Sequence, residues 1–188
     1  MDLKKTVAQI EYKILGGDKP QVNRFWDECN QKSIDILCCS DRPQKDVFSY
    51  ATIGLTDTNI GLYSEDKRLS IELVGACDAK IKEYPNILAS TAFEIIDKQK
   101  CNYGCIVPNV IGQYIPEIDM KNIYLMSPFL WENLNTVEFK DRKVTWLLAV
   151  PISDNELQYA MENGTDALED KFEEADIDIF DIRRKSIL

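Results

Sequence analysis

The sequence predicts an α+β fold in which one mixed β-sheet packs against helices, within a single domain of residues 1–188. One observation is the length of 188 residues, which is typical of one domain. A second is the hydrophobic content of 45%, which is enough for an extensive core. A third is that segments with helical spacing occur beside segments rich in β-branched and aromatic residues.

Two helices are predicted in the first half of the chain. Residues 1–17 form an N-terminal helix, because apolar residues recur every three or four positions and a Gly-Gly pair ends the pattern. Its apolar face consists of Leu3, Val7, Ile10 and Ile14. The second helix follows Pro85, because proline is well accommodated in a first helical turn. Its apolar stripe consists of Leu88, Ala92, Ile95 and Ile96.

The last part of the chain is predicted to form two more helices and a tail. Ser153 and Glu156 match the S-x-x-E capping box that begins a helix, and Gly164 is expected to end it. A short helix with Leu168 and Phe172 four residues apart follows. The tail, "DIDIFDIRRKSIL", alternates acidic residues with Ile or Phe, which predicts a strand or an extended docking segment.

Six segments rich in β-branched or aromatic residues are predicted to be strands. They are residues 33–39, 47–55, 69–76, 122–126, 136–139 and 143–150. The last is almost entirely apolar around Trp146, which is typical of a central strand covered on both faces. Pro151 is expected to end this strand.

Acidic residues are concentrated in the C-terminal segment 154–188, within a chain of formal net charge −10. Eleven acids lie between its first residue and Asp181, and Lys171 is the one basic residue among them. Such a field repels nucleic acids and membrane surfaces and attracts basic partners. The alternative is a solvated helical face that only keeps the protein soluble.

The sequence offers little for catalysis. It contains no histidine, which removes the commonest general base and every catalytic triad that needs one. The glycine-rich phosphate-binding motifs and the G-x-S-x-G nucleophile motif are also absent. We therefore expect no enzyme, and no residue is predicted to be catalytic or to bind a cofactor or metal.

One enzymatic alternative stays open. Glu117-x-Asp119-x-Lys121 and Glu138-x-Lys140 have an acid-x-Lys spacing that several metal-dependent nucleases use. In that chemistry the acid holds magnesium and the lysine stabilises charge on the phosphate. The competing interpretation is a surface strand with alternating charge.

The six cysteines are predicted to be reduced thiols, because the N-terminus lacks the features of a signal peptide. No apolar run is long enough to span a bilayer, so we expect a cytoplasmic protein. Cys38 and Cys39 should point to opposite faces of a strand. Cys101 and Cys105 have a C-x-x-x-C spacing, but no histidine is present to complete a mixed zinc site.

A series of segments, in this order, resembles the suppressor-of-fused domain family. They are "YATIGL" (50–55), "IELVGA" (71–76), "NILAS" (86–90), "SPFLWE" (127–132), "TWLLAVPIS" (145–153) and "DIDIFDIRRKS" (176–186). The segments "FWDE", "SIDIL" and "ELVGAC" are similar to a bacterial subgroup, the antitoxins from Bacillus-type polymorphic toxin loci. The resemblance covers most of the chain from about residue 20 onward, and it implies a fold like the N-terminal domain of the longer animal members.

The resemblance also implies a function. The bacterial members resemble immunity proteins that neutralise an LXG-type toxin with a C-terminal nuclease domain, and they carry no catalytic residues. The animal members bind a transcription-factor peptide as an added strand between two domains. A peptide-binding regulator of a non-toxin partner is therefore the second hypothesis, and the metal-dependent nuclease is a distant third.

An acidic protein can block a nuclease by placing carboxylates where phosphates would bind. The predicted partner-binding residues are Asp154, Glu156, Asp166, Glu169, Asp170, Glu173, Glu174, Asp176 and Trp131. Trp131 lies on a predicted loop, where it is either an exposed anchor or folded back over the edge of the core. The competing mode of inhibition binds the toxin away from its active site, through a sheet edge.

Overall fold

The computed structural model describes residues 3–17 and 19–188. In chain order the helices are α1 (Leu3–Leu15), α2 (Tyr84–Lys98), α3 (Asp154–Asn163) and α4 (Thr165–Ala175), with a short 3₁₀ helix at Leu55–Asp57. The strands are β1 (Gln21–Trp26), β2 (Ser33–Cys39), β3 (Val47–Ile53), β4 (Tyr63–Ser64), β5 (Lys67–Asp78), β6 (Ile106–Val107), β7 (Met120–Met126), β8 (Val137–Glu138) and β9 (Arg142–Ser153).

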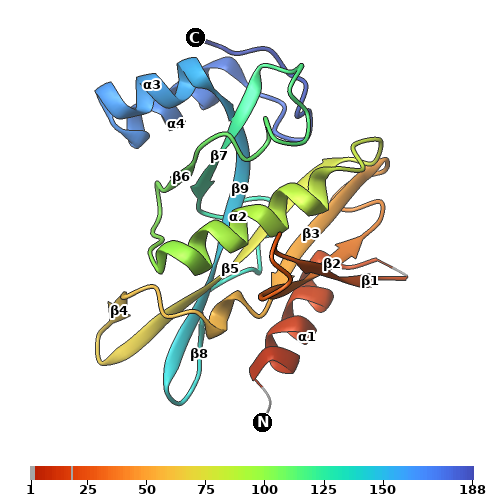
Figure 1. Cartoon of the computed structure of the whole chain (residues 1–188), viewed down its shortest axis with the longest axis vertical. Coiled ribbons are helices and arrows are strands. Elements are labelled where there is room, and N and C mark those ends of the chain that lie inside the picture. Colours follow the sequence, from red (N-terminus) through yellow and green to blue (C-terminus); the bar gives the residue numbers. More distant parts are fainter. Residues whose placement is uncertain (1–2, 18) are drawn as a thin grey trace.

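The strands form one mixed sheet in the order β1-β2-β3-β5-β9-β7-β6, with β4 beside β5 and β8 beside β9. The central pair β5 and β9 is parallel, with Leu73 opposite Leu147, and the other pairs are antiparallel. The predicted α+β class is therefore confirmed. A parallel pair needs a long crossover connection, and here α2 lies within it (Figure 1).

Both faces of the sheet are covered, and the alternation of side chains along β9 separates two cores. Trp146 and Leu148 belong to the core beneath α1, α3 and α4, whereas Leu147 and Ala149 belong to the core beneath α2. This confirms the prediction of a central strand that is buried on both sides. Cys38 and Cys39 of β2 likewise lie in opposite cores, as expected.

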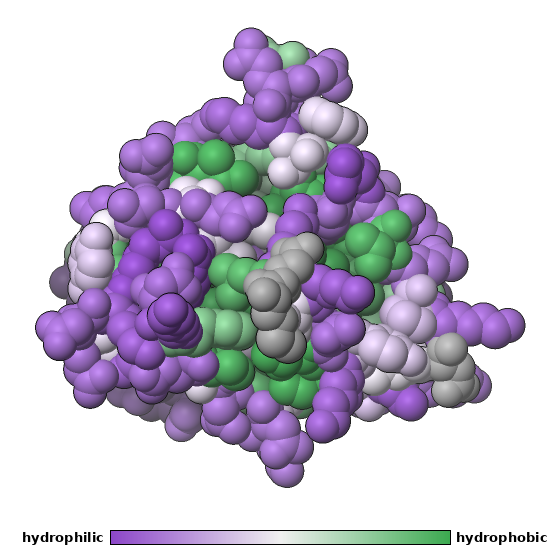
Figure 2. Space-filling view, turned by 90° about the horizontal axis from the view of Figure 1, so that it is seen from below, coloured by the Kyte–Doolittle hydropathy of each residue, from purple (hydrophilic) through white to green (hydrophobic). Residues whose placement is uncertain are grey.

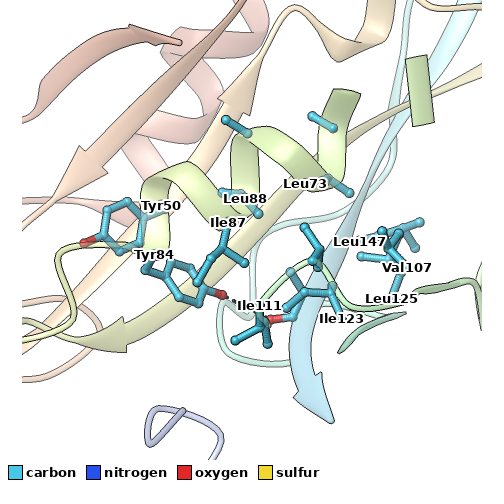
Figure 3. Packing of buried hydrophobic residues seen from close by; sticks show 14 of the residues in the cluster. Tyr50, Leu73, Tyr84, Ile87, Leu88, Val107, Ile111, Ile123, Leu125 and Leu147 are labelled. Carbon is cyan, nitrogen blue, oxygen red and sulfur yellow. Dashed lines mark hydrogen bonds between the residues drawn. The ribbon is translucent and has the colours of Figure 1, made fainter. Parts of the chain in front are cut away.

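The α2 core is formed by helix residues that point into the sheet (Figure 3). Ile87 and Leu88 pack there against Leu73 and Leu147 of the central strands. The Tyr84 hydroxyl donates a hydrogen bond of 3.2 Å to the carbonyl of Ala149. A side chain at Gly75 would overlap this hydroxyl, so glycine is required where β5 passes beneath α2.

The opposite core holds α1 at one end and the α3–α4 pair at the other (Figure 1). Of the predicted apolar face of α1, Val7 is buried, and Leu3, Ile10 and Ile14 are partly buried against the same core. Leu15 is buried as well, although it was not predicted, and Gly16 follows the helix with a φ of 76°. At the end of the molecule seen in Figure 2, hydrophobic residues form separate patches between hydrophilic ones. None of the helices in residues 3–17 and 19–188 is long and apolar enough to cross a membrane.

The structure corrects the prediction that Pro151 ends the last strand. β9 continues to Ser153, and Pro151 pairs with Ile123 of β7. The ladder between β5 and β9 already ends at Leu148. Pro151 is therefore paired with a strand on one side only, an edge-like position in which the missing N–H of proline is tolerated.

Other elements also differ from the prediction, among them the two-residue strands β4 and β6, which were not predicted. β1 was not predicted; its side chains are mostly exposed, so its sequence lacks the apolar alternation of a half-buried strand. The tail after α4 forms turns and not a strand. Asp178 and Asp181 accept hydrogen bonds from the backbone N–H two residues further on, at 2.9 and 2.8 Å, and such bonds favour turns over strands.

Candidate functional site

The acidic helices α3 and α4 lie side by side at the end of the molecule that carries the C-terminus (Figure 1). The capping box before α3 is present as predicted: the Glu156 N–H donates to Ser153 Oγ at 3.0 Å, and the Ser153 N–H donates to Glu156 Oε2 at 2.9 Å. Gly164, with a φ of 92°, ends α3 and precedes α4. The turn thus places the two helices against each other.

Glu156 was predicted to bind a partner, and the structure corrects this. Its side chain is 0% exposed and forms an ion pair of 2.7 Å with Arg184, which is itself 8% exposed. Glu156 also accepts a hydrogen bond from the Ile187 N–H at 3.1 Å. Its carboxylate holds the tail against α3 and cannot reach another protein.

Trp131 was named as a partner-binding residue, with an exposed anchor and a side chain folded back over the core as the two alternatives, and the structure excludes the exposed anchor. It is 6% exposed and packs in the core with Leu134 and Val144. Its loop is folded back over the core, which was the alternative considered from the sequence. Two residues earlier, Phe129 is 56% exposed. The hydrophobic residue that this loop presents to solvent is therefore Phe129, which sequence reasoning missed.

Most of the predicted carboxylates on α4 do face solvent. Asp166, Asp170, Glu173 and Glu174 are exposed, and the one lysine of the helix, Lys171, pairs with Glu174 at 2.6 Å. The last turn of α4 contains no basic residue, so its acids stand at the negative end of the helix dipole. This arrangement opposes helix stability, so stability alone does not explain it.

The remaining predicted acids have partly structural roles. Glu169 is half-buried and accepts hydrogen bonds from the hydroxyls of Tyr103 and Tyr124. Burial and this carboxylate raise the pKa of Tyr103 to about 12. Asp176 is exposed and caps α4 with a φ of 47°. Asp154 is exposed at the start of α3 and accepts a hydrogen bond from the Asn122 amide at 3.0 Å.

Between α4 and the tail the surface is hollowed into a groove of about 450 Å³, which we call the α4 groove. Its apolar lining comes from β7, β9, α4, the tail and the loop of Phe129. The apolar residues are Met126, Phe129, Leu130, Val150, Phe172, Ile177, Ile179 and Phe180. Four acids also line it: Glu169, Glu173, Asp176 and Asp178. The structure thus joins part of the predicted acidic surface to an apolar hollow that the sequence did not reveal.

The acid-x-Lys segments lie elsewhere, and cations face their carboxylates. Glu117 lies 3.8 Å from Arg183, Asp119 lies 3.4 Å from Lys185, and Glu138 lies 2.7 Å from Lys67. Within the part of the chain that the structure describes, no group of three or more His, Cys, Asp or Glu side chains could hold a metal ion.

Cys101 and Cys105, considered for a zinc site, contact each other. The hydrogen bond between their side chains, followed by burial, raises the pKa of Cys101, and the same hydrogen bond lowers the pKa of Cys105 to about 6. All six cysteines are free thiols in the structure.

Fold and surface together define an α+β protein with an acid-lined apolar groove, an arrangement suited to binding another protein. The chain belongs to the suppressor of fused (SUFU) family, whose model matches residues 30–185. It is 44% identical over 186 residues to a Bacillus subtilis (strain 168) protein named Immunity protein YqcF. The aligned region covers 98% of this chain and 96% of that protein.

Solved structures agree on the fold. A crystal structure of a protein described as a SUFU homologue, from Neisseria gonorrhoeae FA 1090, matches with a TM-score of 0.75 at 16% identity, over 100% of this chain and 98% of the other. Drosophila Suppressor of Fused matches with a TM-score of 0.59 at 13% identity. That match covers 98% of this chain but 50% of the Drosophila chain. The resemblance to this family noted in the sequence is confirmed.

Proposed function

We propose that this protein is an immunity protein, which binds a toxin protein and neutralises it without catalysing a reaction. The name of the Bacillus subtilis relative supports this role, because the similarity extends over nearly the full length of both chains. In this role the protein acts in the cytoplasm of the cell that produces the toxin. The residues that support binding lie on the exposed acidic surface of α4 and the tail.

We further propose that the toxin is of the LXG type and that its C-terminal domain is a nuclease. The LXG type rests on the resemblance to the bacterial subgroup, and the nuclease rests on the row of exposed carboxylates on α4, with Lys171 the one cation of the helix. A nuclease grips phosphates with a basic cleft, and carboxylates spaced along a helix can occupy such a cleft. Asp170 and Glu173 are central to this surface and fully available, since both are exposed and neither has an ion pair among those found in the described residues.

Co-expression with the nuclease-type toxin domain encoded beside the gene of this protein tests the proposal. We expect the wild type to preserve colony growth and to co-purify with the toxin domain. The double variant Asp170→Lys/Glu173→Lys should raise the dissociation constant about tenfold or more, because it turns two attractive contacts into repulsive ones. Growth arrest with the wild type, and no complex, would disprove the immunity function.

The matched control is Asp66→Lys/Glu28→Lys, which makes the same change of net charge at two exposed acids outside α4 and the tail. It should protect as well as the wild type. If the control fails and the α4 variant protects, the binding surface lies elsewhere on the molecule. Glu169 is unsuited to charge reversal, because its loss would also free two tyrosine hydroxyls.

A second function, a peptide-binding regulator of a non-toxin partner, is favoured by β1. This strand is the last in the sheet order on its side, and it exposes Val22 by 55% and Trp26 by 53%. An extended peptide can add to such an edge. Protection from the toxin by a variant with Val22→Pro, a substitution that disfavours strand pairing within β1, would favour the immunity function and the α4 surface.

A further inference from the structure

We propose that the α4 groove is an anchor pocket, in which one bulky apolar side chain of the partner inserts while cations around it meet the acidic rim. This inference deepens the proposed function and rests on it, since it states how the toxin is recognised. It makes recognition of the partner depend on shape as well as on charge. A partner with a basic surface but without a protruding apolar residue should bind poorly.

Size and lining support this occupant. The groove has a volume of about 450 Å³, within the range of pockets that enclose small ligands, so an aromatic side chain fits. Val150 and Phe172 form buried parts of its lining, and Phe129 stands exposed beside it. Apolar pockets of this kind hold the residues that dominate protein interfaces, above all Trp and Tyr.

The rim supports a basic partner. Glu173, Asp176 and Asp178 are exposed around the apolar lining, and none of them has an ion pair among those found in residues 3–17 and 19–188. A purely apolar ligand would leave these carboxylates uncompensated at the edge of a desolvated pocket. Lysine or arginine residues that flank an apolar side chain would satisfy them.

The groove is also held in shape before binding. The Arg184 guanidinium lies over the ring of Phe172, 5.6 Å from the ring centre. The ion pair with Glu156 holds that guanidinium in place, so the Phe172 wall of the groove is supported. Hydrogen bonds from the hydroxyls of Tyr103 and Tyr124 likewise hold the Glu169 side chain in place. A pocket whose walls are already ordered loses little entropy when a partner inserts.

The variant Phe129→Glu separates an anchor pocket from charge attraction. It removes an exposed apolar wall and adds one negative charge, at a position that is 56% exposed and so contributes little to folding. If charge alone governed binding, the complex with the toxin domain would become tighter. We expect it to become weaker by about tenfold, because the inserted side chain loses apolar contact.

The control is Tyr63→Glu, the same kind of change at an aromatic residue that is 66% exposed on β4, at the opposite end of the molecule from α4 (Figure 1). It should bind as tightly as the wild type. Unchanged or tighter binding by Phe129→Glu would overturn the anchor pocket and leave the immunity function standing.

A second experiment needs no toxin. The probes are the peptides Lys-Lys-Trp-Lys-Lys and Lys-Lys-Ala-Lys-Lys, titrated into the isotope-labelled protein and followed by NMR. We expect the tryptophan peptide to bind about tenfold tighter and to shift the amide signals of Ile177, Ile179 and Phe129. Equal affinities, or shifts confined to other regions, would overturn the proposal. Failure of the wild type to protect cells would instead count against the proposed function.

Discussion

At the scale of single residues, two fully buried glutamates, Glu11 of α1 and Glu72 of β5, repel each other where α1 packs on the sheet. Glu11 of α1 accepts a hydrogen bond of 2.9 Å from Trp146 Nε1, and its Oε2 has no partner. Burial first, and then the charge of Glu72, raise the pKa of Glu11 well above its usual value. Burial also raises the pKa of Glu72 to about 7, although hydroxyls and backbone N–H groups near Thr52 and Thr56 donate to it.

The folded state therefore binds more protons than the unfolded state between the ordinary pKa of about 4.5 and the raised pKa of about 7 for Glu72. The contribution of these carboxyl groups to stability is therefore fully present below that window and is lost as pH rises through it. We expect Glu11→Gln to flatten this decline and to raise the free energy of unfolding at pH 8 by about 1–3 kcal/mol. Urea unfolding at pH 5, 6, 7 and 8 measures this. An unchanged slope would mean that Glu11 does not titrate in this range.

At the scale of elements, the tail is held to α3 by one buried ion pair. Arg184 donates to both carboxylate oxygens of Glu156, at 2.7 and 2.8 Å, and to the carbonyl of Pro151 at 3.0 Å. Ile182 is buried in the α2 core, so the tail also closes the end of the sheet. The Glu156 carboxylate takes part in both the ion pair and the capping box, so the start of α3 and the tail are held together by the same side chain.

Removing one partner of this pair should be costly, because it leaves a buried charge uncompensated. We expect Arg184→Met to lower the free energy of unfolding by about 3–5 kcal/mol. The double variant Glu156→Gln/Arg184→Met should recover part of this loss, since the remaining side chains are neutral. Urea unfolding of the three proteins measures both effects, and a double variant less stable than Arg184→Met would contradict this account.

At the scale of the whole molecule, the concentrated negative charge lies at one end, away from the centre of the two hydrophobic cores. The sheet and its two cores occupy the centre, and the concentrated negative charge lies on α4 and the tail at one end (Figure 1). An extended field of one sign accelerates the approach of an oppositely charged partner. Salt screens such a field over about 8 Å at physiological ionic strength.

We therefore expect the association rate constant with the toxin domain to fall about tenfold or more between 50 and 500 mM NaCl. The dissociation rate constant should change less, because the inserted apolar side chain is insensitive to screening. Stopped-flow or surface-binding kinetics at several salt concentrations measure both. A nearly constant association rate would count against the acidic surface and favour binding through the edge of β1.

Much of the fold follows from local sequence. The helical spacing of Val7, Ile10 and Ile14, the S-x-x-E capping box and the apolar run around Trp146 each determined an element, because each depends on neighbours in the chain. β1 escaped prediction because an exposed strand carries no apolar alternation. Pro151 was wrongly expected to end the strand, because the sequence does not show that the pairing between β5 and β9 stops before it, at Leu148.

The sequence by itself determined that this protein is an acidic α+β member of its family without histidine chemistry, since composition, periodicity and ordered motifs are properties of the chain. Only the tertiary structure decided which acidic side chains are exposed and available to bind a partner. It turned Glu156 inward to Arg184, buried Trp131 and exposed Phe129, and it closed a groove between α4 and the tail. The reason is that burial depends on contacts between segments far apart in sequence, which no local pattern records.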